Sequence, residues 1–262
     1  MKKKIAMLLC VTMMMGLALT GCGGKEADGK NMVYAVEAGS AGEEAAKEQG
    51  FNYNSVASQA DALMEVASGT SDAAIIDLLM AGAMIGEGTS YPNLTYTDKL
   101  TAEEYGVGCR KGSDLASFIN AVFADTYADG SLQELAEKYG VQEALLKQPA
   151  CEYEASADSD VAYIQGKGTL IVGITDFAPM DYKEGSDEWI GFDADMARLT
   201  AERLGVEVQF VEIDWDNKIM ELNSKNLDVV WNGMTLTDET TSAMECSNAY
   251  CMNAQVVVVP AK

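Results

Sequence analysis

The sequence predicts an α/β protein of two units with mainly parallel sheets, and two observations lead to this prediction. Apolar runs of strand length alternate with segments of helical apolar spacing, both before and after a polar connector at about 141–162. The chain has 262 residues, of which 48% are hydrophobic, so it can bury one large core or two smaller ones.

The part of the chain before the connector forms the first series of strands and helices. The apolar run at 32–36 predicts a strand, and the helix after it has Ser40 as its expected N-cap and Glu43 as the capping-box partner. Residues 72–77 predict a buried strand, and 103–113 a strand that ends in a turn. Helices are further expected at 58–69, at 78–88 and, as a pair joined by "ADGS", at 113–140, with N-caps at Ser113 and Ser131 and a C-cap at Gly140.

The second series follows the connector. Its strands are expected at 169–174, 207–213, 227–231 and 253–259, and its helices at 191–205 and 216–226. Parallel α/β sheets bind ligands at the carboxyl ends of their strands. The candidate binding loops are therefore those after Val36, Ile76, Ile174, Ile213 and Trp231.

The N-terminus indicates export. Three lysines precede an apolar stretch that ends near Leu19 and is too short for a stable membrane span, which is typical of a signal segment. The end of this stretch, "LTGC", resembles the lipobox of bacterial lipoproteins. That resemblance implies removal of residues 1–21, lipid on Cys22, a tether over 22–30 and anchoring to the outer face of the cytoplasmic membrane. The alternative is an ordinary secretory signal with a chance cysteine.

Composition excludes several functions. The formal net charge of −23 repels phosphate backbones, so no nucleic-acid partner is expected. Histidine is absent, which excludes Ser-His-Asp triads and ordinary His-containing zinc sites, and no metal or other cofactor is expected. Cys109, Cys151, Cys246 and Cys251 remain after the lipobox, and an even number permits disulfides in an exported protein. A Cys109–Cys251 bridge and free thiols both stay open.

Many short segments along the chain resemble the sequence motifs of one protein family. They include "LIVGITDFAPMDY", "WIGFDADMA", "IDWDNKIMEL", "LDVVWNGMTLTDE", "VEAGSAGEE", "SDAAIID" and "EEYGVGCRKGSDLASFIN". Together they resemble the polar amino-acid type of substrate-binding protein that serves bacterial ABC importers, over nearly all of 32–262 outside the connector. The resemblance implies a two-lobed fold of the type II periplasmic-binding-protein class, a monomer that closes on a small ligand, and delivery of that ligand to a membrane permease.

The order of these segments departs from the family. In the usual order the segment near Thr169 comes first, whereas here it follows the segments that should come last, so the chain resembles a circular permutant. The expected units are a smaller lobe at 31–103 and a larger lobe at 104–262, with the hinge at about 103–109 as the single covalent crossing. Permutation is tolerated where the new ends fall in an exposed linker.

The resemblance also implies a ligand site, position by position. Two aromatic side chains, Phe177 and Trp215, match those that sandwich the ligand, and Asp77 matches the acid that receives the ligand ammonium. An Asp at a strand end is otherwise more often a helix N-cap. The remaining expected ligand-binding positions are Asn232, Gly233 and Thr235 at the "GMT" turn, Ser40 and Ala41 at a helix N-terminus, and Asp176, whose register is uncertain.

One position of the pattern differs. Where the family pattern T-D-E-R has an Arg that pairs with the ligand carboxylate, this chain has Thr240. Either hydroxyl and N–H groups alone hold the carboxylate, or the ligand has none. Glu37, with the acids already named, makes the site acidic, which favours a cationic or amine-bearing ligand over a neutral one. The alternative is that these carboxylates point to solvent.

The sequence thus predicts an extracytoplasmic binding lipoprotein, not an enzyme, that passes a small polar solute to an ABC importer. Two other functions stay open. One is a ligand-sensing lipoprotein that reports to a separate receptor. The other is a dehydratase-like enzyme on the same fold, in which cleft carboxylates such as Asp77, Asp176 and Glu37 supply an acid or base.

Overall fold

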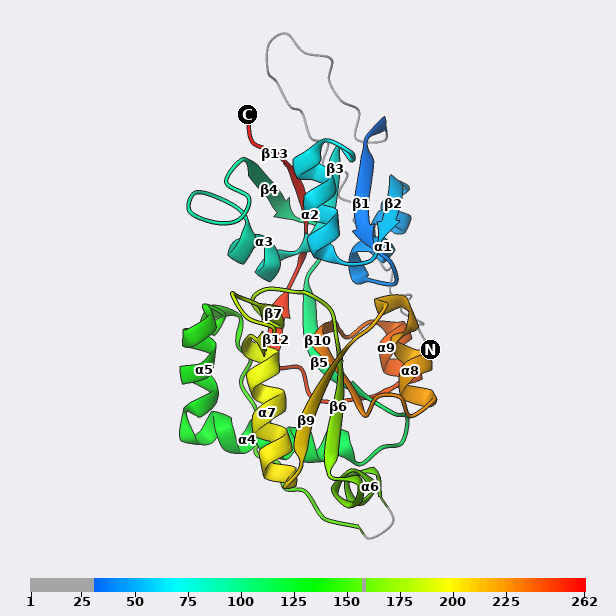
Figure 1. Cartoon of the computed structure of the whole chain (residues 1–262), viewed down its shortest axis with the longest axis vertical. Helices are drawn as coiled ribbons and strands as arrows, with labels where there is room; N and C mark the ends of the chain where they lie inside the picture. The colour runs from blue at the N-terminus through cyan, green and yellow to red at the C-terminus, as the bar shows by residue number, and fades with distance from the viewer. Residues whose placement is uncertain (1–30, 157–158) are drawn as a thin grey trace, which may run out of the picture.

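The computed structural model describes residues 31–156 and 159–262. The expected signal segment, the tether and Cys22 lie outside these residues. Figure 1 shows the described chain as two α/β lobes, one above the other, with strands passing between them. The protein therefore has the mixed α/β architecture that the sequence predicts.

The five-stranded lobe is built from the start and the end of the described chain. Its sheet has the order β2-β1-β3-β13-β4. The strands are β1 (Val33–Glu37), β2 (Asn52–Val56), β3 (Ala73–Asp77), β4 (Leu94–Lys99) and β13 (Gln255–Pro260), and the helices are α1 (Ala41–Gln49), α2 (Gln59–Ser68) and α3 (Leu78–Met84). Every residue of β3 is buried, because this apolar run lies in the middle of the sheet with helices packed against it.

The six-stranded lobe holds the remaining elements. Its sheet has the order β11-β5-β10-β6-β9, and β12 also pairs with β5. The strands are β5 (Glu103–Cys109), β6 (Thr169–Ile174), β9 (Glu207–Glu212), β10 (Val229–Thr235), β11 (Glu245–Cys246) and β12 (Cys251–Asn253), beside a hairpin of β7 (Tyr182–Lys183) and β8 (Trp189–Ile190). The helices are α4 (Leu115–Asp129), α5 (Ser131–Tyr139), α6 (Asp160–Lys167), α7 (Phe192–Leu204), α8 (Lys218–Asn223) and α9 (Asp238–Ala243), with short 3-10 turns η2 (Gln142–Ala144) and η3 (Trp215–Asn217).

The expectation of mainly parallel sheets was wrong, because both sheets are mixed. Strands β1, β2 and β3 run parallel, as do β6, β9 and β10. The strands next to the lobe crossings, β4, β5, β12 and β13, pair antiparallel. The βα strands of each sheet have their carboxyl ends at the side that faces the other lobe. A chain that crosses between the lobes enters the sheet from that side, so it runs antiparallel to those strands.

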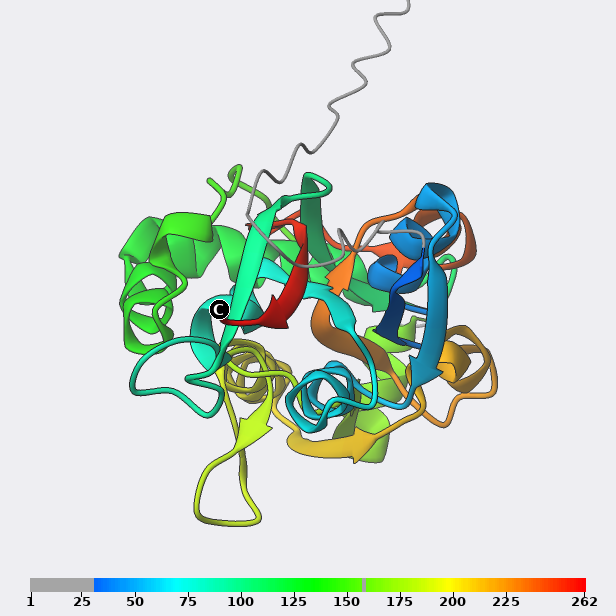
Figure 2. The same cartoon turned by 90° about the horizontal axis from the view of Figure 1, so that it is seen from above.

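The chain crosses between the lobes twice, whereas the sequence analysis expected one crossing and placed residues up to 262 in the larger lobe. Strand β13 belongs to the five-stranded sheet, between β3 and β4, and Figure 2 shows it in red from above. Its side chains Val256 and Val258 are fully buried there. A run of four valines is apolar on both faces, so it is stable as an inner strand and would be costly as a free end.

The two crossings lie side by side. The N–H of Leu100 donates to the Gln255 carbonyl at 2.8 Å, and the N–H of Gln255 donates to Thr101 Oγ1 at 2.8 Å. These bonds join the segment between β4 and β5 to the segment between β12 and β13. Both covalent crossings therefore run through one hydrogen-bonded strip.

Helix ends agree with the sequence at some positions and differ at others. Ser40 caps α1 by accepting the N–H of Glu43 at 3.1 Å, and Gly140 ends α5 in the left-handed conformation, as expected. The N-caps of α4 and α5 are Asp114 and Gly130 instead of the expected Ser113 and Ser131. The shift is one residue in each case. The N–H of Leu115 donates to Ser113 Oγ at 3.2 Å, and the N–H of Ser131 donates to Asp129 Oδ1 at 2.9 Å.

The connector at 141–162 is more ordered than its composition indicates. Its last residues begin α6, and buried charges fasten this part of the chain to the lobe: Arg110 binds Asp160 at 3.1 Å and Asp228 at 3.4 Å, while Lys167 binds Asp228 at 2.5 Å. Earlier in the connector, the N–H of Leu146 donates to the Tyr250 carbonyl at 2.8 Å. The connector therefore lies along the six-stranded lobe.

Candidate functional site

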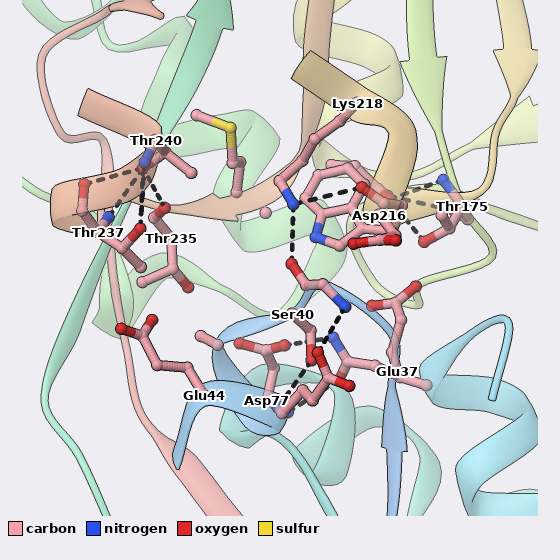
Figure 3. A pocket seen from close by; sticks show the side chains of 18 of the residues that line it. Glu37, Ser40, Glu44, Asp77, Thr175, Asp216, Lys218, Thr235, Thr237 and Thr240 are labelled. Carbon is pink, nitrogen blue, oxygen red and sulfur yellow. Dashed lines mark hydrogen bonds between the residues drawn. The ribbon is translucent and has the colours of Figure 1, made fainter. Parts of the chain in front are cut away.

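A cavity of about 340 Å³ lies between the two lobes. Its walls come from the carboxyl ends of β1 and β3 and the start of α1 on one side, and from the ends of β6 and β10 and the starts of η3, α8 and α9 on the other. Figure 3 shows labelled side chains of both lobes pointing toward this space. The volume falls in the range of small-molecule sites in proteins.

The structure brings the expected site residues together with one exception. The lining contains Glu37, Ser40, Ala41, Asp77, Phe177, Trp215, Asn232, Gly233, Thr235 and Thr240. Asp176 is not part of the lining and is exposed, whereas its neighbour Thr175 lines the cavity.

Asp77 ends β3 inside a dense set of donors. The Tyr105 hydroxyl donates to Oδ1 at 2.6 Å and the Gln255 amide at 3.0 Å, and the side-chain amides of Gln59 and Asn253 donate as well. Although Asp77 is the N-cap residue of α3, its side chain makes no capping hydrogen bond. Burial and then the nearby Glu103 raise the pKa of Asp77 to about 7.

Glu37 ends β1, the strand next to β3. Its side chain is 3% exposed, and its Oε1 accepts no hydrogen bond from the residues that the structure describes. Burial raises the pKa of Glu37 to about 8, the charge of Asp77 adds to this, and Lys218 opposes it. Buried carboxyl oxygens without partners are rare, so Glu37 is an unsatisfied acceptor inside the cavity wall.

The two expected aromatic residues both lie in the wall of the cavity. Phe177 packs edge-on against Tyr105, with ring centroids 6.3 Å apart. Trp215 is 7% exposed and belongs to a small apolar cluster under α8. A Cβ atom on Gly233 would lie 2.5 Å from the Phe177 ring, so only glycine permits this position of the ring.

The predicted donors at the "GMT" turn already have partners. The Gly233 N–H donates to Asp193 Oδ2 at 2.6 Å, and the Thr235 hydroxyl donates to Glu103 Oε2 at 3.2 Å. Asn232 accepts the N–H and hydroxyl of Thr175 at 2.6 and 2.7 Å. These groups therefore fix the shape of the wall, and Asp193, a buried acid whose pKa rises to about 7 mainly through burial, holds the turn from behind.

Lys218 is the site residue that the sequence analysis missed. Its ammonium donates to the Gly39 carbonyl of the opposite lobe at 2.8 Å and to the Trp215 carbonyl at 3.3 Å. Its side chain is nearly buried, and burial lowers its pKa. The available signal was its spacing, because a residue three positions after Trp215 lies on the same side of the turn.

Close approach of the lobes also depends on Gly39. This residue has φ +69°, and a Cβ atom on it would lie 2.7 Å from the Asp216 Cα of the other lobe. Its N–H donates to Glu43 Oε2 at 3.1 Å, so the expected capping-box carboxylate of α1 binds one residue before the N-cap.

No arginine among the described residues lines the cavity. Arg110, Arg198 and Arg203 pair with acids elsewhere in the six-stranded lobe. The Thr240 hydroxyl is held in a capping box with Thr237 and also donates to the Thr235 carbonyl at 3.1 Å. Thr240 thus lies on the cavity without offering a cation.

Within residues 31–156 and 159–262, no group of three or more acidic or Cys side chains is arranged to hold a metal ion. Cys109, Cys151, Cys246 and Cys251 are free thiols. None of the helices described has both the length and the apolar character needed to cross a bilayer.

Comparison with known proteins finds a family whose model matches part of the chain. Residues 170–262 match the model for bacterial extracellular solute-binding proteins, family 3. The arginine-binding extracellular protein ArtP of Bacillus subtilis is 34% identical over 105 residues, which are 40% of this chain and 41% of that protein. The L-cystine-binding protein TcyJ of Escherichia coli is 31% identical over 91 residues, or 34% of each chain.

A solved structure described as an ancestral cationic amino acid solute binding protein is 39% identical, with a TM-score of 0.31, over 32% of this chain and 37% of that one. The match to the arginine-binding relative spans 41% of that protein's length, about two fifths. Both curated relatives are named as binding proteins and not as enzymes.

Proposed function

We propose that this chain, whose residues 170–262 match family 3 of the bacterial extracellular solute-binding proteins, captures one small amino acid between its two lobes. The observation that supports this most directly is the cavity between the lobes, walled by strand ends of both sheets. Lys218 of one lobe binds the Gly39 carbonyl of the other, so the wall on both sides of the cavity is held in a closed arrangement.

The ligand we propose is an amino acid with a cationic side chain. Carboxylates outnumber ammonium groups in the lining, which contains Glu37, Glu43, Glu44, Asp77, Asp216 and Glu239 against Lys47 and Lys218. An excess of negative charge in a closed cavity favours a positively charged ligand. The Lys218 ammonium has three N–H donors, and its two carbonyl partners leave one for a ligand carboxylate.

A thermal-shift screen of residues 23–262 against the proteinogenic amino acids, ornithine and polyamines tests the proposal. Ligand at one hundred times its Kd stabilises the folded state by about 2.7 kcal/mol, which raises Tm by several degrees. We expect the largest shift with lysine, arginine or ornithine. Absence of a shift with every amino acid would refute the amino-acid assignment. A shift with polyamines alone would mean that the ligand carries no carboxylate.

We further propose that the protein acts as an exported lipoprotein monomer that hands its ligand to an ABC importer. The "LTGC" sequence ending at Cys22 supports the anchor, and the named activities of the relatives support the exported location. Labelling of the cells with a fatty acid should mark the wild-type chain and leave a Cys22→Ala variant unmarked. Equal labelling of both would refute the anchor. Loss of ligand uptake in cells without this protein would support delivery.

We also propose that the chain is a circular permutant of its family. The family match is confined to the part that begins at residue 170, and the five-stranded lobe is completed by segments from both ends of the described chain. In this arrangement the break falls between β13 and β1, two strands of one sheet, and both lobe crossings stay covalent.

A further inference from the structure

Among the acids of the described cavity lining, Glu37 is set apart by a buried oxygen that has no hydrogen-bond partner. It lies at the carboxyl end of β1 and is 3% exposed, and no described residue donates a hydrogen bond to Oε1. Figure 3 shows its carboxyl group pointing from the strand end toward the side of the cavity where Asp216 lies. A carboxyl group buried to this extent needs a donor, and Glu37 is one of the residues that line the cavity.

Asp77 has far less capacity for a new partner. Four side chains already donate to it, from Gln59, Tyr105, Asn253 and Gln255. A carboxylate offers about four lone-pair positions, so these donors nearly saturate it. Asp77 therefore acts mainly through the charge that it presents to Glu37 from the neighbouring strand.

The cations of the described lining do not neutralise Glu37. Lys218 approaches it but donates to the carbonyls of Gly39 and Trp215, and no salt bridge joins Lys218 to Glu37. Lys47 pairs with Glu43 at 2.8 Å. The groups that face Glu37 from the other elements are Asp77, Lys218, Gln59 and Thr175, of which only Lys218 carries positive charge.

We infer that Glu37 selects the positively charged group of the ligand, accepting its N–H donors through its carboxyl group and losing its own proton as that group arrives. The inference rests on the proposed function and deepens it, because it names the residue that separates cationic from neutral amino acids. Near neutral pH the buried carboxyl is mostly protonated, since its pKa lies at about 8. A ligand cation supplies the charge and the hydrogen bonds that make the ionised form stable.

Two matched pairs of amino acids test this in the wild-type protein, without any substitution. Lysine is compared with norleucine, and arginine with citrulline, by isothermal titration of residues 23–262 at fixed ionic strength. We expect the charged member of the preferred pair to bind roughly ten- to hundredfold more tightly, the range for a charge-assisted hydrogen bond. Titration in two buffers of different ionisation enthalpy should show proton release on binding.

Glu37→Gln is the informative variant, and Glu48→Gln is its control. Gln keeps the size of the buried side chain and resembles the protonated form, so we expect the variant to fold, with Tm as the check. Glu48 is exposed on α1 of the same lobe and lies outside the cavity lining, so its substitution makes the same chemical change away from the ligand. We expect Glu37→Gln to abolish both the preference for the charged ligand and the proton release, and Glu48→Gln to retain both.

The outcomes separate this inference from the proposed function. Wild-type binding of norleucine or citrulline as tight as that of the charged partner would overturn the role of Glu37 and leave amino-acid capture intact. Unchanged selectivity in Glu37→Gln would do the same. Binding of none of the four amino acids, with no shift in the wider screen, would overturn the proposed function itself.

Discussion

At the scale of single residues, the polar groups of the site are of two kinds: those that already have hydrogen-bond partners and those that do not. The turn at Gly233 and the amide of Asn232 are engaged by buried partners, while Glu37 and Lys218 keep unused capacity toward the cavity. Groups of the first kind set the shape of the wall and those of the second kind can bind. The two kinds cannot be told apart in sequence, because both are polar residues at strand ends.

Lys218→Met tests the bond between the lobes. The substitution keeps the length of the side chain and removes its donation to the Gly39 carbonyl, so the closed arrangement loses a charge-assisted hydrogen bond. We expect ligand affinity to fall roughly tenfold and small-angle scattering with ligand to report a larger radius. Lys147→Met, which changes an exposed lysine of the connector outside the cavity lining, is the control and should leave both unchanged. Identical behaviour of the two variants would show that Lys218 does not stabilise the closed arrangement of the lobes.

At the scale of elements, burial explains which strands and helices the sequence reveals. The run that became β3 is buried along its whole length, and its apolar residues predicted it correctly. β10 runs from Val229 to Thr235 and so includes the residues expected in a turn after position 231. The polar strand β2 lies at a sheet edge with most of its residues exposed, so it left no apolar pattern. The run of β13 predicted a buried strand but not which sheet buries it, because periodicity carries no information on the partner.

Helix α7 depends on one glycine at its start. Gly191 has φ +131°, and a Cβ atom on it would lie 2.0 Å from the Met180 carbonyl oxygen. We expect Gly191→Ala to lower the free energy of unfolding by about 3 kcal/mol, because it combines a strained backbone with a clash. It should also weaken ligand binding, since α7 positions Asp193 behind the Gly233 turn.

The matched control lies in α6. Gly166 has open space where its Cβ would be, so Gly166→Ala should raise the unfolding free energy by about 0.5–1 kcal/mol. Chemical denaturation of both variants measures the two effects. Equal stability of the Gly191 variant and the wild type would contradict the role assigned to the turn.

At the scale of the whole molecule, buried acids set the pH dependence of stability. In the folded state, the pKa of Glu37 is raised from 4.5 to about 8. The pKa values of Asp77 and Asp193 are raised from 3.8 to about 7. A folded state with raised pKa values holds protons that the unfolded chain releases, so this stability is present below about pH 4 and is lost as pH rises to 8. Each group lowers the unfolding free energy by about 1.4 kcal/mol per pH unit within its window.

Denaturation at pH 5 and pH 8, at one ionic strength, measures this effect. We expect the protein to be less stable at pH 8, and Glu37→Gln to reduce the difference. Asp114 and Asp195, whose pKa values are lowered by hydrogen bonds despite burial, act in the opposite direction and lose stability only as pH falls through the acid range. Higher stability at pH 8 than at pH 5 would contradict the assignment.

Restoring the family order tests the permutation. A reordered chain would begin at Asp160, pass from Lys262 through a short Gly-Ser linker to Asn31, and end at Gly140. The start of β1 and the end of β13 lie at the same end of one sheet, on either side of β3, so the gap to be linked is about 10 Å. We expect Tm within about 5 °C and unchanged ligand preference. Failure to fold would show that the present order is required.

The same placement of the two ends decides how the molecule responds to pulling. Tension applied at Val33 and Pro260 draws β1 and β13 away from β3 from one end, so their hydrogen bonds break one after another and not all together. Such peeling needs little force. The six-stranded lobe is entered only by internal segments and bears no load until β13 has been stripped from its sheet. A chain held at both ends would therefore open first in the lobe that carries Glu37 and Asp77.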